Sequence, residues 1–177
     1  LLAMVCDDAV LRGAEPALVG STLDVASLGD GTKTLPIIRA LAEGYVTAAK
    51  EAGVTVANGE LAQLGASVGG YGEFPIVWNS SCVWFGMRER LFTGREIKAG
   101  DSVVALREHG FRSNGFSLVR RAFETAYGAE WHKEPFEEST LGEAALLPSR
   151  IYSRLVNHLH GGFAGRAVAP LHGVVHV

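Results

Sequence analysis

The sequence has few cysteines, no block of basic residues and no apolar stretch long enough to cross a bilayer. Its two cysteines, Cys6 and Cys82, each lie in an apolar run, where a reduced, buried thiol is the ordinary outcome. Two such cysteines give no basis for expecting a disulfide framework or a cysteine-based metal site. No run approaches the roughly 20 apolar residues of a membrane-spanning helix, and no basic region precedes the apolar start. We therefore expect a cytoplasmic soluble protein that binds no membrane.

Net charge and chain length further limit the kinds of protein that this sequence can encode. Lys and Arg (16) are outnumbered by Asp and Glu (19), which gives a net charge of −3 and no electrostatic reason to expect nucleic acid. With 177 residues, of which 47% are hydrophobic, the chain can form one globular domain or two small ones. It starts at Leu1 and stops inside an apolar run, 172–177, so we expect the interior of a longer polypeptide.

The segment 102–128 joins a predicted strand to a predicted helix. Residues 102–106 are apolar and rich in β-branched side chains, which is typical of a strand covered on both faces. Phe116, Phe123 and Tyr127 recur at helical spacing, and glycine follows at position 128. We expect Ser113 or Asn114 to cap this helix and leave backbone N–H groups free to face an anion. On the local pattern alone, a purely structural helix cap is the commoner reading.

The apolar run 1–6 predicts a buried strand that ends at Asp7 and Asp8. Two adjacent carboxylates repel each other unless water or a cation compensates, and Mg²⁺ bound to nucleotide phosphates is a natural partner. The alternative is that one of the two aspartates caps a short helix over 9–13.

The remaining pattern predicts an ordered series of elements. Strands are expected at 17–25, 54–57 and 76–86, a turn at 30–33, a helix at 36–52 and a glycine-rich loop at 65–72. Glu60 would lie at the exit of the second of these strands. A surface linker at 87–99 suggests a domain boundary near residue 93, and 128–139 reads as an exposed loop. In a last predicted helix, Ile151, Leu155 and Leu159 are spaced to pack on one face, and the helix would end at 161–162.

Residues 109–120, His-Gly-Phe-Arg-Ser-Asn-Gly-Phe-Ser-Leu-Val-Arg, resemble Ser-Gly-Leu-His-Ser-Asn-Gly-Tyr-Ser-Leu-Val-Arg of the aminoimidazole ribonucleotide synthetases, also called phosphoribosylformylglycinamidine cyclo-ligases. Further segments resemble the family in the family's order: 3–16, the strand that leads to Glu60, 146–152 and 172–177. After Glu60 the chain departs from the family, because Gln63 stands where the family has a second glutamate.

The resemblance implies an α/β (α+β) fold with two domains, 1–92 and 93–177, and a homodimer. It implies ATP-dependent cyclisation of formylglycinamidine ribonucleotide with ATP and Mg²⁺, which these 177 residues alone are not expected to perform. It places Asp8 and Glu60 at the nucleotide, and Asp7, Asp8 and Glu60 at the metal. It places Arg112, Ser113, Asn114 and Gly115 at the ribonucleotide substrate, and makes His176 a candidate catalytic residue. The alternatives are a relative that uses ATP on another substrate and a non-catalytic paralogue that dimerises.

Overall fold

The computed structural model describes residues 1–70 and 72–176 and has the mixed α/β composition that the sequence predicts. By internal contacts the chain divides into two compact units. One unit consists of Leu1–Ala99 and Ile151–Val177, and the other of Gly100–Arg150. The predicted division into 1–92 and 93–177 concerns the domains of a longer protein and stays a prediction.

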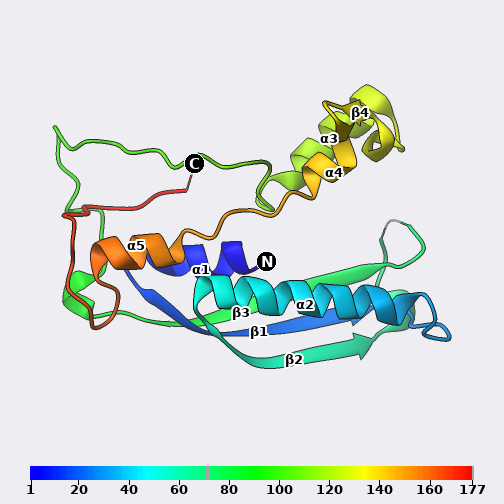
Figure 1. The fold of residues 1–177 in the computed structure, drawn as a ribbon, viewed down its shortest axis with the longest axis horizontal. Coiled ribbons are helices and arrows are strands. Elements are labelled where there is room, and N and C mark those ends of the chain that lie inside the picture. The colour runs from blue at the N-terminus through cyan, green and yellow to red at the C-terminus, as the bar shows by residue number, and fades with distance from the viewer. Residues whose placement is uncertain (71, 177) are drawn as a thin grey trace. The chain divides into compact units, whose positions relative to one another are not determined.

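The first unit is built on a three-stranded sheet with strand order β2-β1-β3 (Figure 1). The central strand β1 (Glu15–Val25) pairs in parallel with β2 (Thr55–Gln63) and antiparallel with β3 (Ile76–Phe85). Helix α2 (Thr34–Ala52) connects the two parallel strands, as a parallel connection requires. These elements confirm the strands predicted at 17–25 and 76–86 and the helix predicted at 36–52.

Helix α2 packs on the sheet through the side chains that recur at its inner face. Tyr45, Ala49 and Ala52 are its buried residues. The Tyr45 hydroxyl lies 3.2 Å from the Gly20 carbonyl oxygen and 2.8 Å from the Ser80 hydroxyl, so the buried polar group is satisfied. The helix ends at Gly53, whose left-handed φ of 73° is easy only for glycine.

The chain begins with a helix, α1 (Leu2–Val10), so the strand predicted at residues 1–6 is wrong. Leu2, Cys6 and Val10 are buried, and they are spaced four residues apart, as one face of a helix requires. A short apolar run does not distinguish a buried strand from a buried helix. The tertiary structure decides here, because Leu2 and Cys6 of α1 pack in one core cluster with Tyr45 of α2 and Val19 of β1.

The two cysteines meet in this core. Cys6 is buried on α1, and Cys82 on β3 packs against the same cluster. The hydrogen bond between the two thiols and burial both raise the pKa of the Cys6 thiol. The same hydrogen bond lowers the pKa of the Cys82 thiol. Both thiols are free, as predicted.

Helix α5 (Ser153–His160) also belongs to the first unit and ends at Gly161. The helix and its end are as predicted, and Ile151 packs against the core as expected, but the prediction that Leu155 packs is wrong. Ser153, Val156 and His160 are buried, whereas Leu155 is 45% exposed.

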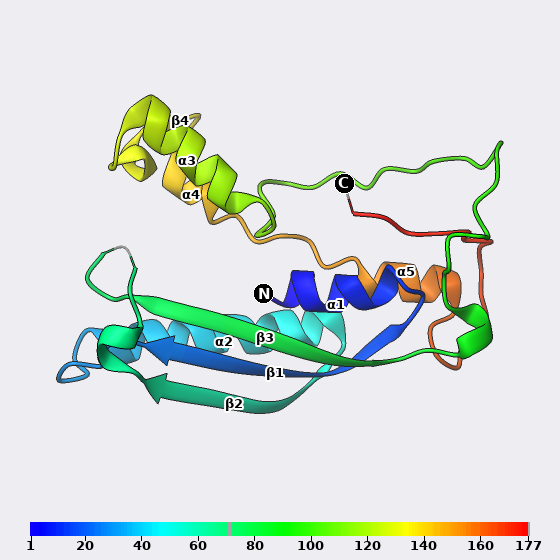
Figure 2. The same ribbon diagram turned by 180° about the vertical axis from the view of Figure 1, so that it is seen from behind.

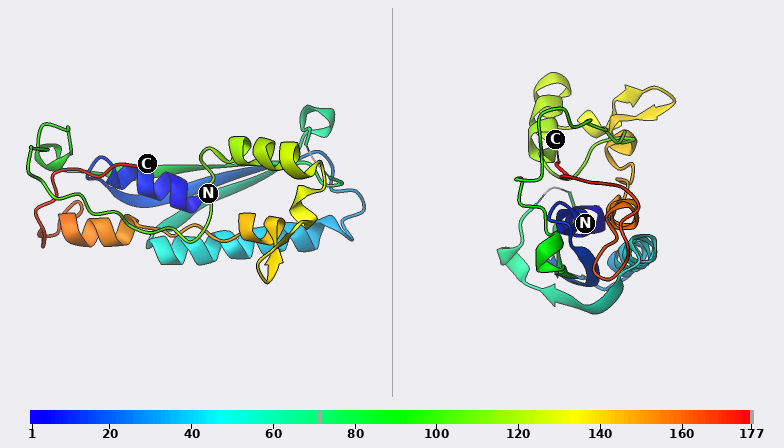
Figure 3. Two further views of the ribbon diagram at one scale, coloured as in Figure 1. Left: turned by 90° about the horizontal axis from the view of Figure 1, so that it is seen from above. Right: turned by 90° about the vertical axis from the view of Figure 1, so that its left-hand side faces the viewer.

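The helices of the first unit gather on one face of its sheet (Figures 2 and 3). Alternate residues of β3 face away from them: Val77, Asn79, Ser81 and Val83 are exposed, and the residues between them are half-buried. No helix of the first unit's described residues covers this outer face. The edge strand β2 is exposed along nearly its whole length.

The second unit is built around α3 (Phe116–Tyr127) and the short helix α4 (Leu141–Ala145). Phe123 of α3 contacts Phe111 and Trp131, so the periodic aromatic face predicted for this helix is its packing face. A small hairpin, β4 (Pro135–Phe136) and β5 (Ser139–Thr140), precedes α4. Thr140 and Glu143 form a capping box at the start of α4.

Two predictions for the second unit are wrong. Residues 102–106 form no strand, and Val103 is 95% exposed. A strand needs a partner, and no described strand pairs with this segment. The N-cap of α3 is Gly115, with no side-chain cap. Ser113 contributes its carbonyl oxygen, which accepts from the Phe116 N–H at 3.2 Å.

Three single-turn helices complete the described elements: η1 (Gly65–Ser67), η2 (Arg88–Arg90) and η3 (Trp131–Lys133). The glycine-rich loop predicted at 65–72 includes η1, and its residue 71 lies outside the described residues. Among the residues that the structure describes, no helix is long and apolar enough to span a membrane.

Candidate functional site

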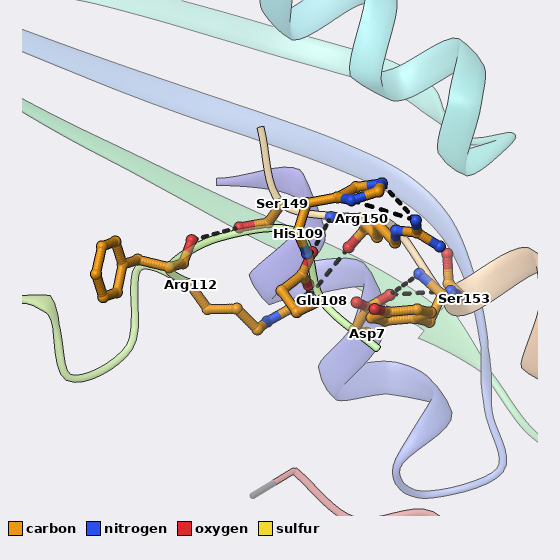
Figure 4. Close-up of polar contacts among 9 residues, drawn as sticks. Asp7, Glu108, His109, Arg112, Ser149, Arg150 and Ser153 are labelled. Carbon is orange, nitrogen blue, oxygen red and sulfur yellow. Dashed lines mark hydrogen bonds and ion pairs between the residues drawn. The ribbon is translucent and has the colours of Figure 1, made fainter. Parts of the chain in front are cut away.

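The second unit holds a polar cluster centred on the Glu108 carboxylate, drawn in Figure 4. One carboxylate oxygen accepts from the backbone N–H groups of His109 (3.0 Å) and Arg150 (3.1 Å). The other accepts from the Arg112 guanidinium at 2.8 Å. The carboxylate therefore joins two segments that lie about 40 residues apart in the sequence.

The ionisation of Glu108 follows from these contacts. Its side chain is only 19% exposed, and burial alone raises the pKa of the carboxyl. The hydrogen bonds from His109, Arg150 and Arg112 and the charge of Arg112 outweigh burial, so the pKa lies below its ordinary value. Glu108 is thus held as a carboxylate.

Arg112, a predicted substrate-binding residue, has its guanidinium engaged within the protein. Besides its ion pair with Glu108, it donates to the Arg150 carbonyl oxygen at 3.1 Å. Its side chain is 22% exposed. Arg150 makes a different kind of contact, because its exposed guanidinium lies against both ring nitrogens of His109.

The predicted loop of Ser113, Asn114 and Gly115 is exposed at the start of α3. Gly115 has a φ of 77°, and a Cβ built there would meet no protein atom within 4 Å. The left-handed backbone therefore favours glycine at position 115. No crowding by other atoms in the described part of this chain adds to that preference. The structure brings these three residues together with Arg112 on one continuous loop.

Asp7 and Asp8, predicted at the nucleotide and metal, are adjacent on α1 but differ in environment. Asp7 is 2% exposed, and one of its oxygens accepts from the N–H groups of Tyr152 and Ser153, each at 2.9 Å (Figure 4). It thereby satisfies backbone donors at the start of α5. Asp8 has a side chain that is 60% exposed.

His176 lies beside Asp8, with 3.7 Å between its Nδ1 and an Asp8 carboxylate oxygen. Sequence reasoning selected both residues, 168 positions apart, and the structure places them together. A neighbouring carboxylate can fix the orientation of an imidazole, as in many acid–base sites. The segment around His176 is extended without strand pairing in the described part of the chain.

Glu60 lies apart from both aspartates. It falls within β2, opposite Thr22, and not at the exit of that strand. On β1, Leu23 and Val25 are buried on the inner face, whereas Thr22 lies on the other face and pairs with the exposed Asn79 of β3. Glu60 therefore projects from the outer face of the sheet. Helix α1 packs on the inner face. A single copy of the chain therefore does not bring Glu60 to Asp8, and its described residues hold no cluster of three or more metal-ligating side chains.

Sequence reasoning missed Glu108, His109 and Arg150 as members of a site. A signal was present, because Glu108 and Arg112 are opposite charges four residues apart. Arg150 stands inside the 146–152 segment that carried part of the resemblance. Their meeting depends on a contact between distant segments, which local patterns do not reveal.

Curated proteins similar to this chain are phosphoribosylformylglycinamidine cyclo-ligases. The one from Gloeobacter violaceus is 33% identical over 174 residues, which cover 97% of this chain and 49% of that protein. The one from Geobacillus thermodenitrificans is 36% identical over 176 residues, which cover 97% and 48%. The chain thus spans about half the length of the curated relatives it matches. No protein-family model matches it.

Two solved structures are also similar. The HypE-HypF complex contains a chain that is 25% identical, with a TM-score of 0.37 over 46% of this chain and 25% of that one. AaThiL complexed with AMPPCP and TMP is 14% identical, with a TM-score of 0.44 over 88% of this chain and 42% of that one.

Proposed function

We propose that this chain, which belongs to the phosphoribosylformylglycinamidine cyclo-ligase family, is part of an enzyme that uses ATP to close the imidazole ring of formylglycinamidine ribonucleotide. The similarity at 33–36% identity over 97% of the chain is the observation that carries the proposal. A match of this extent includes the loop of residues 113–115 before α3.

The proposed reaction forms one carbon–nitrogen bond and breaks one carbon–oxygen bond. ATP transfers a phosphoryl group to the formamide oxygen of the substrate, and the amidine nitrogen attacks the activated carbon. The oxygen leaves as phosphate, and ADP and aminoimidazole ribonucleotide are the products. Such chemistry depends on positioning and on neutralising phosphoryl charge more than on a protein nucleophile.

Two arrangements in the chain suit this chemistry. The exposed loop of Ser113, Asn114 and Gly115 leads into an α-helix, whose N-terminal end carries a partial positive charge that favours a phosphate. Asp8 and His176 form a carboxylate–imidazole pair in which the carboxylate can orient the ring and the ring can hold a proton at a nitrogen. We assign the loop to the substrate and the pair to the reacting groups.

The carboxylates predicted for Mg²⁺ fit it unequally. Mg²⁺ takes one or two protein carboxylates and completes its shell with phosphate oxygens and water. The exposed Asp8 suits such a contact. Asp7 suits it poorly, because one of its oxygens already accepts two backbone N–H groups. Glu60 lies on the other side of the sheet, so it would need a second site or a second copy of the chain.

We also propose that the protein is a homodimer paired through the outer face of the sheet. Leu18 and Val83 lie opposite each other on β1 and β3 and are 38% and 53% exposed, and Val77 is 44% exposed. Burial of such apolar side chains favours association. A second copy would cover them and would also approach Glu60.

An alternative is that the protein uses ATP on another substrate. Gln63, which replaces a glutamate of the family, accepts a hydrogen bond from the Leu28 N–H at 2.9 Å. The amide thus holds the turn after β1, a structural use that needs no charge. The loss of a carboxylate at this position is the departure from the family that leaves room for another substrate.

ATP hydrolysis by the full-length protein, with and without formylglycinamidine ribonucleotide, tests the proposal. We expect phosphate release that depends on the ribonucleotide, with formation of aminoimidazole ribonucleotide. Hydrolysis unaffected by this compound would favour the alternative substrate. Absence of nucleotide binding by calorimetry with Mg²⁺ present would favour a non-catalytic paralogue.

A further inference from the structure

The backbone of Arg150 is held on both sides by side chains of the 108–112 segment. Its N–H donates to Glu108 at 3.1 Å, and its carbonyl oxygen accepts from Arg112 at 3.1 Å. Glu108 and Arg112 are themselves joined at 2.8 Å. The pair acts as a clamp that fixes the position of the Arg150 Cα atom.

Further contacts hold the same two segments together. The Ser149 hydroxyl donates to the Phe111 carbonyl oxygen at 3.3 Å. A Cβ on Gly110 would lie 3.3 Å from the Leu147 Cβ, so glycine allows the segments to approach closely. Figure 4 shows the resulting cluster with the Arg150 and His109 side chains against each other.

The charges of the two arginines are compensated differently. Arg112 is neutralised by Glu108. Among the described residues, no carboxylate pairs with the Arg150 guanidinium, and its side-chain contact is the His109 ring. Because arginine has only donors, the ring nitrogen that meets it must be an acceptor. The imidazole thus orients the guanidinium and leaves it positively charged and exposed.

We propose that Arg150 is the guanidinium that binds the anionic group of the ligand, and that Arg112 is a positioning residue. The ligand class is a phosphomonoester on a ribose, recognised by two parallel N–H donors of the guanidinium. This rests on the proposed function for the identity of the ribonucleotide. It differs from the sequence-based expectation, which gave the substrate contact to Arg112.

Calorimetric titration of the full-length protein with ribose 5-phosphate tests this assignment, with ribose as the uncharged control. Arg150→Gln should weaken ribose 5-phosphate binding about tenfold or more, as expected for loss of a charge-assisted contact. Arg150→Lys should recover only part of the affinity, because an ammonium cannot form the two parallel bonds. Arg121→Gln, which removes another exposed guanidinium on α3, should leave the affinity unchanged.

Variants at Arg112 separate positioning from contact. Arg112→Lys can keep the ion pair with Glu108 and should bind ribose 5-phosphate within about threefold of the wild type, whereas Arg112→Gln should lose affinity. A larger loss in Arg112→Lys than in Arg150→Lys would overturn the assignment. Circular dichroism must show that each variant is folded. The Arg150 variants should have the wild-type spectrum, because Glu108 and Arg112 contact only the backbone of Arg150.

The outcomes distinguish this inference from the proposed function. Unchanged affinity in Arg150→Gln, or no binding of ribose 5-phosphate by the wild type, overturns the inference even if the enzyme closes the imidazole ring. Binding that depends on Arg150 in a protein that does not convert formylglycinamidine ribonucleotide supports the inference and refutes the proposed function.

Discussion

At the scale of single residues, Glu108 shows how one carboxylate can organise a loop. It accepts three hydrogen bonds from two segments and has a lowered pKa because of them. A carboxyl whose pKa is lower in the folded state adds stability at a pH above its unfolded value of about 4.3. That stability is lost as the pH falls through the lower, folded value.

We therefore expect Glu108→Gln to reduce the free energy of unfolding at neutral pH and to make it less dependent on pH in acid. Urea unfolding followed by circular dichroism between about pH 3 and pH 6 measures both effects. Glu138→Gln removes an exposed carboxylate of the same unit and serves as the control. Equal pH dependence of Glu108→Gln and the wild type would contradict the role assigned to this hydrogen-bonded carboxylate.

Gly115 gives a second prediction at this scale. Its φ of 77° is left-handed, and no protein atom crowds it. Gly115→Ala should cost about 1 kcal/mol of stability, and Gly115→Asn less, because asparagine tolerates this conformation. If the ribonucleotide approaches the backbone here, both variants should also lose substrate affinity, while Ser117→Ala should not. If Gly115→Asn bound the substrate with normal affinity, the loop would have only a structural role at the start of α3.

At the scale of elements, α2 and α5 both end at a left-handed glycine, but the space around the two glycines differs. Gly53 and Gly161 both terminate their helices in a left-handed conformation, with φ of 73° and 91°. A Cβ at position 53 would lie 3.5 Å from Arg154, an ordinary contact. At position 161 it would lie 2.6 Å from the Ala167 nitrogen, which is backbone and cannot easily move.

Gly53→Ala should therefore cost about 1 kcal/mol, the conformational term alone. Gly161→Ala should cost clearly more, about 2 kcal/mol or above, because steric strain adds to that term. Thermal and urea unfolding of the two variants give the comparison. Equal losses would show that the segment after α5 moves aside without cost.

At the scale of the whole molecule, the outer face of the sheet has apolar side chains that the first unit leaves exposed. If two copies pair through this face, Val83→Glu places a charge in the interface. The dimer dissociation constant should then rise at least about tenfold. Sedimentation equilibrium of the full-length protein measures it, with Val103→Glu as the control, since Val103 is 95% exposed in the other unit. An unchanged dimer would exclude this face as the interface.

The sequence predicted those elements whose signals are local. Helix α2 has a proline near its start, an apolar face of regular period and a glycine at its end, and the helix was predicted within a few residues. The same holds for β1 and β3, which are long and rich in strand formers. The predicted site loop before α3 is likewise a contiguous stretch, and its residues lie together because they are neighbours in the chain.

The mixed α/β class, the long periodic elements and the family resemblance follow from the sequence alone, since each depends on residues close in the chain or on matched motifs. Tertiary structure decided whether the apolar runs 1–6 and 102–106 became helix, strand or neither, because that depends on what packs or pairs with them. It also decided that Asp7 caps α5, that Asp8 meets His176, and that Glu108 and Arg112 hold Arg150. These contacts join residues from 38 to 168 positions apart, and no local pattern encodes such a distance because the intervening chain must first fold.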